Sequence, residues 1–271
     1  MPQIDLNDIV LEYSRAGSGE CLLFIQGVGC KGCAWQPQTG VLQSEFDCIS
    51  FDNRGIGNSV GKTAGLTIEQ MADDAVAILD AFQINQAHII GHSMGGVIAH
   101  ELALRYPDRV NSLSLMCTLH RGKDATTLTF GLLKNALLTS IGTISMRRKA
   151  FARMVSSPQY IAENGIDFVV KELSETFQRD LAKLPSVVKM QLRALSRHDS
   201  SHRLHQLSEI PSMVIAGSFD PIGRPLLAKR LAAAIRTKNL HIFDDASHAA
   251  PIQYPDRINR LLRNHILSAS D

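Results

Sequence analysis

The chain has 271 residues, of which 45% are hydrophobic and 20% are charged. Its 28 basic and 26 acidic side chains leave a formal net charge of +2. This is the composition of a globular protein with an ample core, so it excludes a disordered chain, a coiled coil and a collagen. The longest basic run is Arg147-Arg148-Lys149, which we interpret as a solvated helix face, and we expect no nucleic-acid partner.

The N-terminus and the cysteines bear on the cellular compartment. Residues 1–13 lack the basic and apolar regions of a signal peptide. No apolar run approaches the roughly 18 residues of a membrane span. The cysteines are odd in number and scattered through a chain too large to need disulfide bonds: Cys21, Cys30, Cys33, Cys48 and Cys117. We therefore expect a cytoplasmic protein with reduced thiols and no membrane partner.

Short apolar segments alternate with segments of helical periodicity along most of the chain. The clearest helix is 67–84, where apolar residues recur every three or four positions and Thr67 and Gln70 have the spacing of a capping box. Such alternation predicts an α/β fold, with a mostly parallel sheet covered by helices on both faces. The expected strands are 9–16, 21–26, 47–51, 87–91, 111–118, 212–218 and 239–243, and the other expected helices are 94–106, 225–235 and 256–266.

Residues 119–207 interrupt the alternation with a long stretch that contains no convincing strand. A structureless loop of this length is improbable in a compact domain. We therefore expect 1–118 and 208–271 to form one core domain and 119–207 to form a helical insertion after the sixth core strand. Its helical patterns lie at 130–138, 147–155, 168–184 and 187–196.

A nucleophile motif lies between the expected strand 87–91 and the helix that follows it. Gly91-His92-Ser93-Met94-Gly95 is G-x-S-x-G in a strand-turn-helix setting, where a sharp turn exposes the serine hydroxyl. The free N–H groups and the dipole of the following helix can stabilise an oxyanion beside Ser93. The alternative is that Ser93 is only a small turn residue.

A nucleophilic serine needs a base, and the base needs an acid that orients it. His248 follows the last expected strand and Asp220 follows the strand before it, so both belong to the carboxyl edge of the sheet, where α/β active sites form. Asp220 could instead be a simple turn residue. Asp244 and Asp245 are weaker candidates because they lie too close to His248 in one loop. We expect His92 to pack or to hydrogen-bond near the turn.

The order Ser93, Asp220, His248 resembles that of the α/β-hydrolase fold superfamily, and the resemblance spans nearly the whole chain. The stretch Asp52-Asn53-Arg54-Gly55-Ile56-Gly57-Asn58-Ser59 is similar to the family's D-x-R-G-x-G-x-S, and 119–207 is similar to its helical cap. Within the superfamily the chain most resembles small esterases and lactonases of the 3-oxoadipate enol-lactonase type.

The resemblance also implies an oxyanion hole. The family's second donor is a backbone N–H just after a His-Gly pair, which here reads Gln26-Gly27. By that correspondence the donors are the N–H groups of Val28 and Met94. Gln26 carries a donor and an acceptor, so it can replace the hydrogen bonds of the histidine.

Two further features of the same loop are Cys30-x-x-Cys33 and the only tryptophan, Trp35. A redox pair or half of a zinc site would have the C-x-x-C spacing, but no second such pair exists. We expect unpaired thiols, with some lining the substrate pocket, and Trp35 as a packing residue.

Together these residues predict a serine hydrolase without cofactor or metal, acting on a small-molecule ester or lactone through an acyl-enzyme on Ser93. The resemblance leaves open hydrolysis of a carbon–carbon bond in a dienoic or β-diketone acid, perhydrolysis, and a ligand receptor on the same fold. The sequence predicts neither the substrate-binding residues nor the oligomeric state.

The charges are unevenly divided between the two parts of the chain. Residues 119–206 hold 14 basic and 7 acidic side chains, against 14 and 19 elsewhere. We interpret this as attraction between insertion and core together with solvated helices. The alternative is that basic residues of the insertion bind an anionic substrate.

Overall fold

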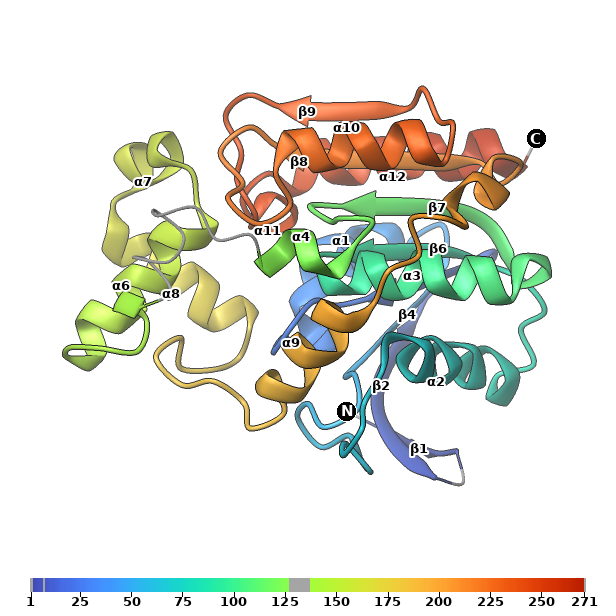
Figure 1. Cartoon of the computed structure of the whole chain (residues 1–271), viewed down its shortest axis with the longest axis horizontal. Helices are drawn as coiled ribbons and strands as arrows, with labels where there is room; N and C mark the ends of the chain where they lie inside the picture. Colours follow the sequence, from blue (N-terminus) through green and yellow to red (C-terminus); the bar gives the residue numbers. More distant parts are fainter. Residues whose placement is uncertain (1, 7, 127–136, 271) are drawn as a thin grey trace.

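The computed structural model of the chain describes residues 2–6, 8–126 and 137–270 (Figure 1). Within these ranges nine strands form one sheet: β1 (Gln3–Asp5), β2 (Ile9–Ala16), β3 (Cys21–Ile25), β4 (Asp47–Phe51), β5 (Val60–Gly61), β6 (Ala87–His92), β7 (Val110–Met116), β8 (Ser212–Gly217) and β9 (Leu240–Phe243). Every expected strand is confirmed, with ends shifted by at most two residues. The short β1 and β5 were not expected, because two or three residues carry no periodic signal.

The strand order is β1-β2-β4-β3-β6-β7-β8-β9, and β5 pairs with β2 off this path. The strands from β4 to β9 along this order pair in parallel, whereas β2 pairs antiparallel with β1, β4 and β5. The mostly parallel sheet predicted from the sequence is confirmed.

Helices cover both faces of the sheet, which is why the central strands are apolar on both sides. On β3, Leu23 and Ile25 pack into one core cluster, and Leu22 and Phe24 into another. The first cluster contains side chains of α2 (Ile68–Ala81), α3 (Met94–Arg105) and α10 (Pro225–Ala234). The second contains side chains of α1 (Gln36–Leu42), α11 (Ala250–Gln253) and α12 (Pro255–Ser270).

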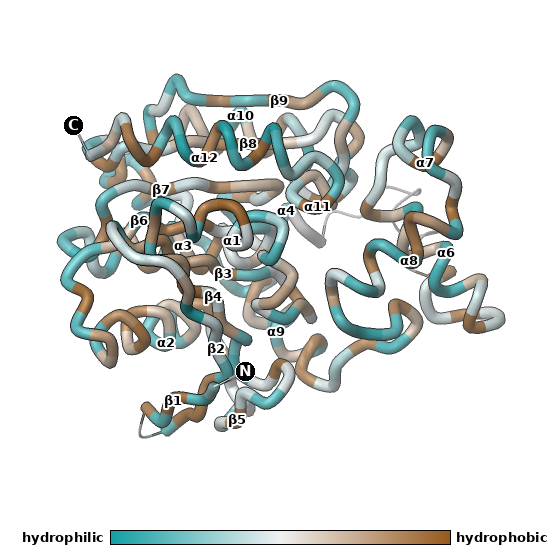
Figure 2. Tube along the Cα trace, turned by 180° about the vertical axis from the view of Figure 1, so that it is seen from behind, coloured by the Kyte–Doolittle hydropathy of each residue, from teal (hydrophilic) through white to brown (hydrophobic). Residues whose placement is uncertain are grey.

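The helices begin and end for local reasons. Thr67 Oγ1 accepts the N–H of Gln70 at 3.1 Å and so caps α2 as its spacing predicted. Helix α12 runs beyond the expected end, and Figure 2 shows apolar and polar residues alternating along it. Its apolar residues Ile258, Leu262 and Ile266 are buried against the sheet.

Between β7 and β8 the described residues form helices α4 (Gly122–Thr126), α6 (Ile144–Val155), α7 (Pro158–Asn164), α8 (Ile166–Thr176) and α9 (Val188–Arg197). The expected helices 147–155 and 187–196 are confirmed. The one expected at 168–184 is wrong in its second half: α8 ends at Thr176, and Gln178 has φ +48°, which an α-helix cannot contain. The helix expected at 130–138 lies largely outside the described residues.

The described residues between β7 and β8, which we call the insertion, pack on loops at one edge of the sheet. Figure 1 shows α6, α7 and α8 grouped beyond the carboxyl ends of the central strands. A third core cluster joins the insertion to the core there: it combines Cys30, Ala34 and Ala249 with Ala152, Val155, Val169, Leu173, Phe177 and Leu181. This contact covers the edge at which Ser93, Asp220 and His248 were expected.

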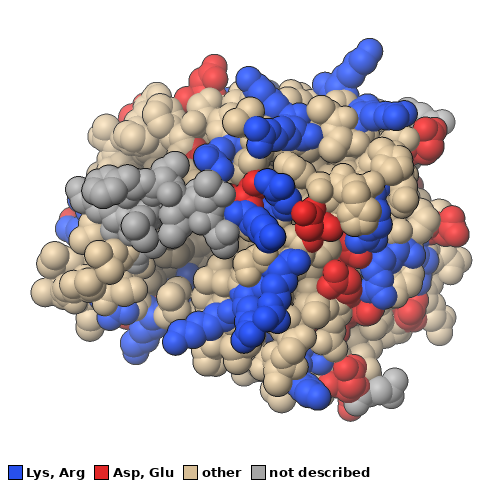
Figure 3. Space-filling model, viewed as in Figure 1, with Lys and Arg blue, Asp and Glu red and all other residues tan. Residues whose placement is uncertain are grey.

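Basic residues of the insertion are paired mainly within it. Arg148 binds Asp180 and Lys149 binds Asp167, so the basic run is not a free patch. Arg203 reaches the core and binds Glu101 of α3 at 2.8 Å. The exposed Lys189, Arg193 and Arg197 recur every four residues along α9, and Figure 3 shows Lys and Arg side chains gathered over this part of the molecule.

No helix in the part of the chain that the structure describes combines the length and the apolar character needed to cross a bilayer.

Candidate active site

Ser93 lies in the sharp turn between β6 and α3. Its backbone has φ +56° and ψ −122°, a combination that is costly for a residue with a side chain. Among the hydrogen bonds that hold its backbone, Ser93 N–H donates to Met116 O at 2.9 Å, and Thr118 Oγ1 donates to Ser93 O at 2.6 Å. The turn also needs a residue without a side chain at Gly95, where a Cβ would lie 2.0 Å from the carbonyl oxygen of Ile25.

The structure brings Asp220 and His248 together although 28 residues separate them. His248 Nδ1 lies 2.8 Å from Asp220 Oδ2, and both residues are buried. The other oxygen, Asp220 Oδ1, accepts the N–H groups of Ile222 and Gly223. Because a carboxylate only accepts, Nδ1 carries the proton and Nε2 presents its lone pair.

The two alternative acids, Asp244 and Asp245, are bound to other side chains. Asp245 is held by Arg257 NH1 at 2.7 Å, and the exposed Asp244 accepts the hydroxyl of Ser218. Neither is paired with His248. Among the described residues Ser93 Oγ makes no hydrogen bond, either to His248 or to another group.

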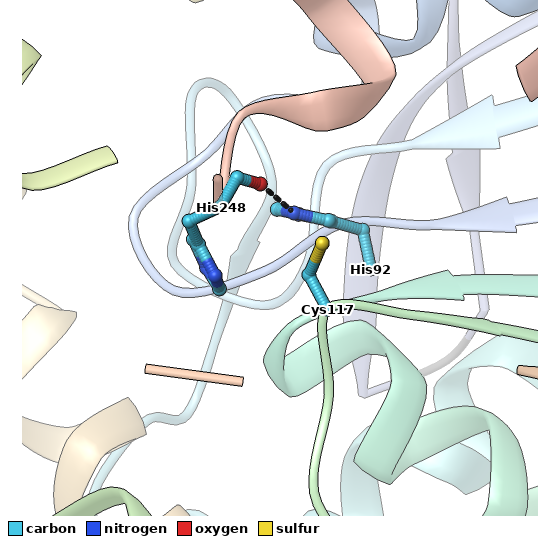
Figure 4. A group of neighbouring side chains, drawn as sticks. All are labelled: His92, Cys117 and His248. Atoms are coloured by element: carbon cyan, nitrogen blue, oxygen red, sulfur yellow. Dashed lines mark hydrogen bonds between the residues drawn. The ribbon is translucent and has the colours of Figure 1, made fainter. Parts of the chain in front are cut away.

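His92 fixes the position of the histidine loop. Its Nε2 donates to the backbone carbonyl of His248 at 2.9 Å, and the two rings lie 4.8 Å apart (Figure 4). Burial, with the neighbouring His248, lowers the pKa of His92 to about 3, so His92 stays neutral and keeps one N–H to donate. The prediction that His92 hydrogen-bonds near the turn is confirmed.

Cys117 lies beside the two histidines, and the nearest ligand atoms of the three residues are within 4.8 Å of one another (Figure 4). A metal would need a thiolate and free ring nitrogens. Burial, reinforced by Asp220, raises the pKa of the Cys117 thiol well above its usual value, and the thiol lies 3.8 Å from Ser247 O. Because the thiol stays protonated and His92 Nε2 holds the carbonyl of His248, these three residues suit a metal poorly even though His248 Nε2 is free.

The turn that follows β3 presents one free N–H. Gly27 N–H donates to Gln26 Oε1 at 3.0 Å, and Cys30 N–H donates to Gly27 O at 3.3 Å. Gly29 N–H donates at 2.9 Å to Gln191 Oε1 of α9. Within the described chain the N–H of Val28 therefore has no protein acceptor. The same holds for Met94 N–H, the first of α3.

This turn lies against the nucleophile. A Cβ on Gly27 would lie 2.9 Å from Ser93 Cβ and 3.4 Å from Ser93 Oγ. Gln26, which stands where the family has a histidine, holds the turn with its side chain, because its Oε1 accepts the N–H of Gly27. The free donors of Val28 and Met94 thus belong to segments that meet at Ser93.

Residues 52–59 hydrogen-bond to both sides of the turn that follows β3. Asp52 Oδ1 accepts the N–H of Gly32 at 2.6 Å, and Asn53 Nδ2 donates to Gln26 O at 2.9 Å. Burial raises the pKa of Asp52 to about 6. Arg54 is buried on Asp74, with NH2 2.6 Å from Oδ1. The sequence showed this stretch only as a resemblance, because its partners are remote in the chain.

The expected thiols and tryptophan are now placed. All five cysteines are free, and Cys30 belongs to the cluster between insertion and core. Burial raises the pKa of Cys30 to about 11, although Arg179 beside it acts the other way. Trp35 is fully buried, with its ring 5.2 Å from that of Phe24, so it is the packing residue that was predicted.

Two surface hollows lie away from these residues. One is lined by Asp80, Asn85 and Arg109, the other by Glu209 and Lys238 among others. Both are formed by segments next to the amino ends of strands, the edge opposite to the one where α/β sites form. They carry no arrangement of nucleophile and base.

The chain matches known proteins along most of its length. A family model described as "alpha/beta hydrolase fold" matches residues 22–255. The "Putative carbamate hydrolase RutD" of Azorhizobium caulinodans is 29% identical over 264 residues, 97% of each chain. The "3-oxoadipate enol-lactonase 2" of Acinetobacter baylyi is 28% identical over 255 residues, 93% of this chain and 91% of its own.

A solved structure of similar fold is the thermophilic esterase from Thermogutta terrifontis. It has a TM-score of 0.79 and 23% identity, covering 96% of this chain and 94% of its own. The likeness concerns the fold, and it agrees with the sheet order and the helices described above. The family inferred from the motifs around Ser93 is thereby confirmed: the chain belongs to the α/β hydrolase fold family, as an enzyme of the hydrolase class.

Proposed function

We propose that the protein is a cofactor-independent serine hydrolase that cleaves a carboxylic ester or a lactone through an acyl-enzyme on Ser93. The observation that carries the proposal is the buried contact of His248 Nδ1 with Asp220 Oδ2 at 2.8 Å, tied by His92 to the strained turn of Ser93. An aspartate that holds one imidazole nitrogen leaves the other free to take the proton of a serine hydroxyl.

In the proposed reaction Ser93 Oγ attacks the carbonyl carbon while His248 Nε2 takes the hydroxyl proton. The oxyanion that forms accepts hydrogen bonds from the N–H groups of Val28 and Met94. Collapse of this intermediate sends the proton from His248 to the departing oxygen and leaves the acyl group on Ser93. A water molecule, deprotonated by His248, then attacks the acyl carbon and regenerates the serine hydroxyl.

The names of several relatives support the substrate class. Carbamate hydrolase, enol-lactonase and esterase each describe attack on a carbonyl carbon that carries an oxygen or nitrogen leaving group, whereas other relatives are named non-heme bromoperoxidase and meta-cleavage product hydrolase. Two free N–H donors beside a serine suit that chemistry. We therefore propose a small molecule with an ester or lactone carbonyl as substrate.

We also propose that residues 119–207 act as a cap over the site, set on a core of residues 1–118 and 208–271. Two contacts support this: Ala249 N–H donates to Val155 O at 2.8 Å, next to His248, and Gly29 N–H donates to Gln191. The cap thus contacts the histidine loop and the oxyanion turn.

The test is covalent labelling. Intact mass after treatment with a fluorophosphonate should show one adduct on the wild-type protein and none on Ser93→Ala. A panel of short and long p-nitrophenyl esters and simple lactones should be turned over by the wild type only, and the chain-length preference would report the size of the acyl pocket.

The matched control is Ser247→Ala, which removes a buried hydroxyl beside His248 that bonds Phe219 O but is not the proposed nucleophile. This variant should still label. A wild-type protein that neither labels nor turns over any member of the panel would contradict the proposal.

A further inference from the structure

The turn Gly27–Cys30 depends on the insertion for one of its bonds. Within the turn itself, Gln26 Oε1 binds Gly27 N–H and Gly27 O binds Cys30 N–H. The third N–H, that of Gly29, reaches no acceptor of the core and is bound by Gln191 Oε1 at 2.9 Å, across 162 residues of sequence. The position of Gly29 is therefore set partly by α9.

Helix α9 packs in direct contact with Gly29. Gly29 has φ +68°, and a Cβ placed there would lie 2.9 Å from Val188 Cγ2 in the first turn of α9. Val188, Gln191, Ala194 and Leu195 are the buried residues of the helix. Gln191 is the polar member of this set, on a face that otherwise packs like any apolar helix face.

Burying the amide of Gln191 in that place costs free energy of folding. It is 0% exposed, and its Nε2 has no hydrogen-bond partner among the described residues. A buried amide with an unpaired donor costs free energy that an apolar side chain of the same size would not. Its one bond, to Gly29 N–H, is the feature that an apolar replacement would lose.

We propose that Gln191 is a positioning residue, which fixes the turn Gly27–Cys30 from the insertion so that the Val28 N–H points at the developing oxyanion. The oxyanion hole would then be complete only while α9 lies on the turn. This inference rests on the proposed function of Ser93 and Val28, and it adds a role for a residue that touches neither substrate nor reacting atoms.

A loosened turn should affect the transition state more than substrate binding. Loss of one oxyanion donor typically costs about 10²–10³-fold in kcat. Since Gln191 only holds the turn, its loss should cost less, on the order of 10–100-fold in kcat, with KM changed by less than about threefold.

The experiment compares two buried glutamines. Gln253 Nε2 donates to Ser156 Oγ at 2.7 Å, another single bond between core and insertion, and its Oε1 has no partner among the described residues. Gln191→Met and Gln253→Met each remove one such bond at nearly constant volume. Only Gln191→Met touches the oxyanion turn.

Three readouts separate positioning from stability. For Gln191→Met we expect the fall in kcat stated above, and an equal loss of affinity for benzeneboronic acid, which forms a tetrahedral adduct with a nucleophilic serine. We also expect hydrogen–deuterium exchange of the peptide 26–33 to be at least about fivefold faster than in Gln253→Met. For Gln253→Met we expect kcat and boronate affinity within about threefold of the wild type.

Equal effects of the two variants on kcat and boronate affinity would overturn the inference, as would unchanged exchange of residues 26–33 in Gln191→Met. These results differ from a failure of the proposed function, which would appear as a wild-type protein inactive on every ester. The exchange measurement needs no turnover, so it would still decide whether Gln191 holds the turn.

Discussion

Around the candidate nucleophile, hydrogen bonds within the protein occupy most of the polar groups and leave a few donors and acceptors free. One carboxylate oxygen of Asp220 accepts two backbone N–H groups, and the other oxygen accepts a hydrogen bond from His248. His92 is neutral and donates its N–H to the loop of His248. The N–H groups of Gly27 and Gly29 are bound by glutamines, which leaves that of Val28. The free groups are thus the ones that the proposed chemistry needs.

We expect Asp220→Asn to lower kcat by about 10⁴-fold with little change in KM, because an amide can hold the histidine in the wrong tautomer. Steady-state kinetics on the best ester would measure this. Asp244→Asn is the control, since Asp244 is exposed and bonds Ser218 rather than His248. Full activity of Asp220→Asn would mean that another acid orients His248.

Asp52 should make stability depend on pH. Burial raises its pKa from 3.8 to about 6, so the folded state favours the protonated form. The contribution of protonated Asp52 to the stability of the fold is then complete below about pH 4, and it is lost as pH rises through about 6. Relative to the wild type, Asp52→Asn should gain up to about 3 kcal/mol in the free energy of unfolding between pH 4 and pH 6.5. Urea unfolding across this range measures the difference, and a constant offset would refute the prediction.

At the scale of single elements, close approach decides the turn between β6 and α3. Gly91, Gly95 and Gly96 would each place a Cβ within 2.6 Å of a backbone or side-chain atom. The first turn of α3 therefore lies directly on β3 and β7, and the N–H of Met94 is held near Ser93. The motif pattern is the sequence consequence of this packing.

We expect Gly95→Ala to destabilise the fold by about 3 kcal/mol or more, since its Cβ would lie 2.0 Å from Ile25 O and the strand cannot move without disturbing the sheet. Gly65→Ala is the control: its φ is +76°, but a Cβ there has no atom within 4 Å. That variant should cost only about 1–2 kcal/mol from backbone strain. Equal losses in thermal or urea unfolding would show that crowding does not limit Gly95.

For the molecule as a whole, the insertion is joined to the core through apolar and polar contacts. On one side lie Cys30 and Ala249 with the apolar residues of α6 and α8. On the other, α3 meets the segment after α9: Arg203 binds Glu101, and the rings of His100 and His198 lie 6.0 Å apart. Burial, reinforced by His198, lowers the pKa of His100 to about 3.

His100 of this interface and His92 next to Ser93 both have a lowered pKa, and both predict that the fold loses stability in acid. A buried histidine whose pKa is depressed stabilises the fold fully above pH 6.5 and loses that contribution as pH falls. Between pH 7 and pH 5 each of His92 and His100 should cost about 2 kcal/mol in the free energy of unfolding. Urea unfolding at pH 7, 6 and 5 measures the slope, and His100→Gln should reduce the loss by about 2 kcal/mol. An unchanged slope would mean that His100 is not buried in its neutral form.

The sequence by itself determined the alternation of strands and helices and the family, and from it came the prediction of Ser93, Asp220 and His248 as a triad. These features are local: an apolar run, a helical period, or a glycine-rich turn shows itself within a few residues. The second half of the helix expected at 168–184 was wrong because apolar spacing continues where the backbone of Gln178 turns out of the helix.

Only the tertiary structure decided which side chains support the site. His92 binds the carbonyl of a residue 156 positions away, and Gly29 binds a glutamine 162 positions away. Asp52 was visible as part of a family stretch, but its bond to Gly32 was not. Such contacts leave no periodic trace in either segment, since each residue satisfies a partner that comes near only when the sheet, its loops and the insertion have packed together.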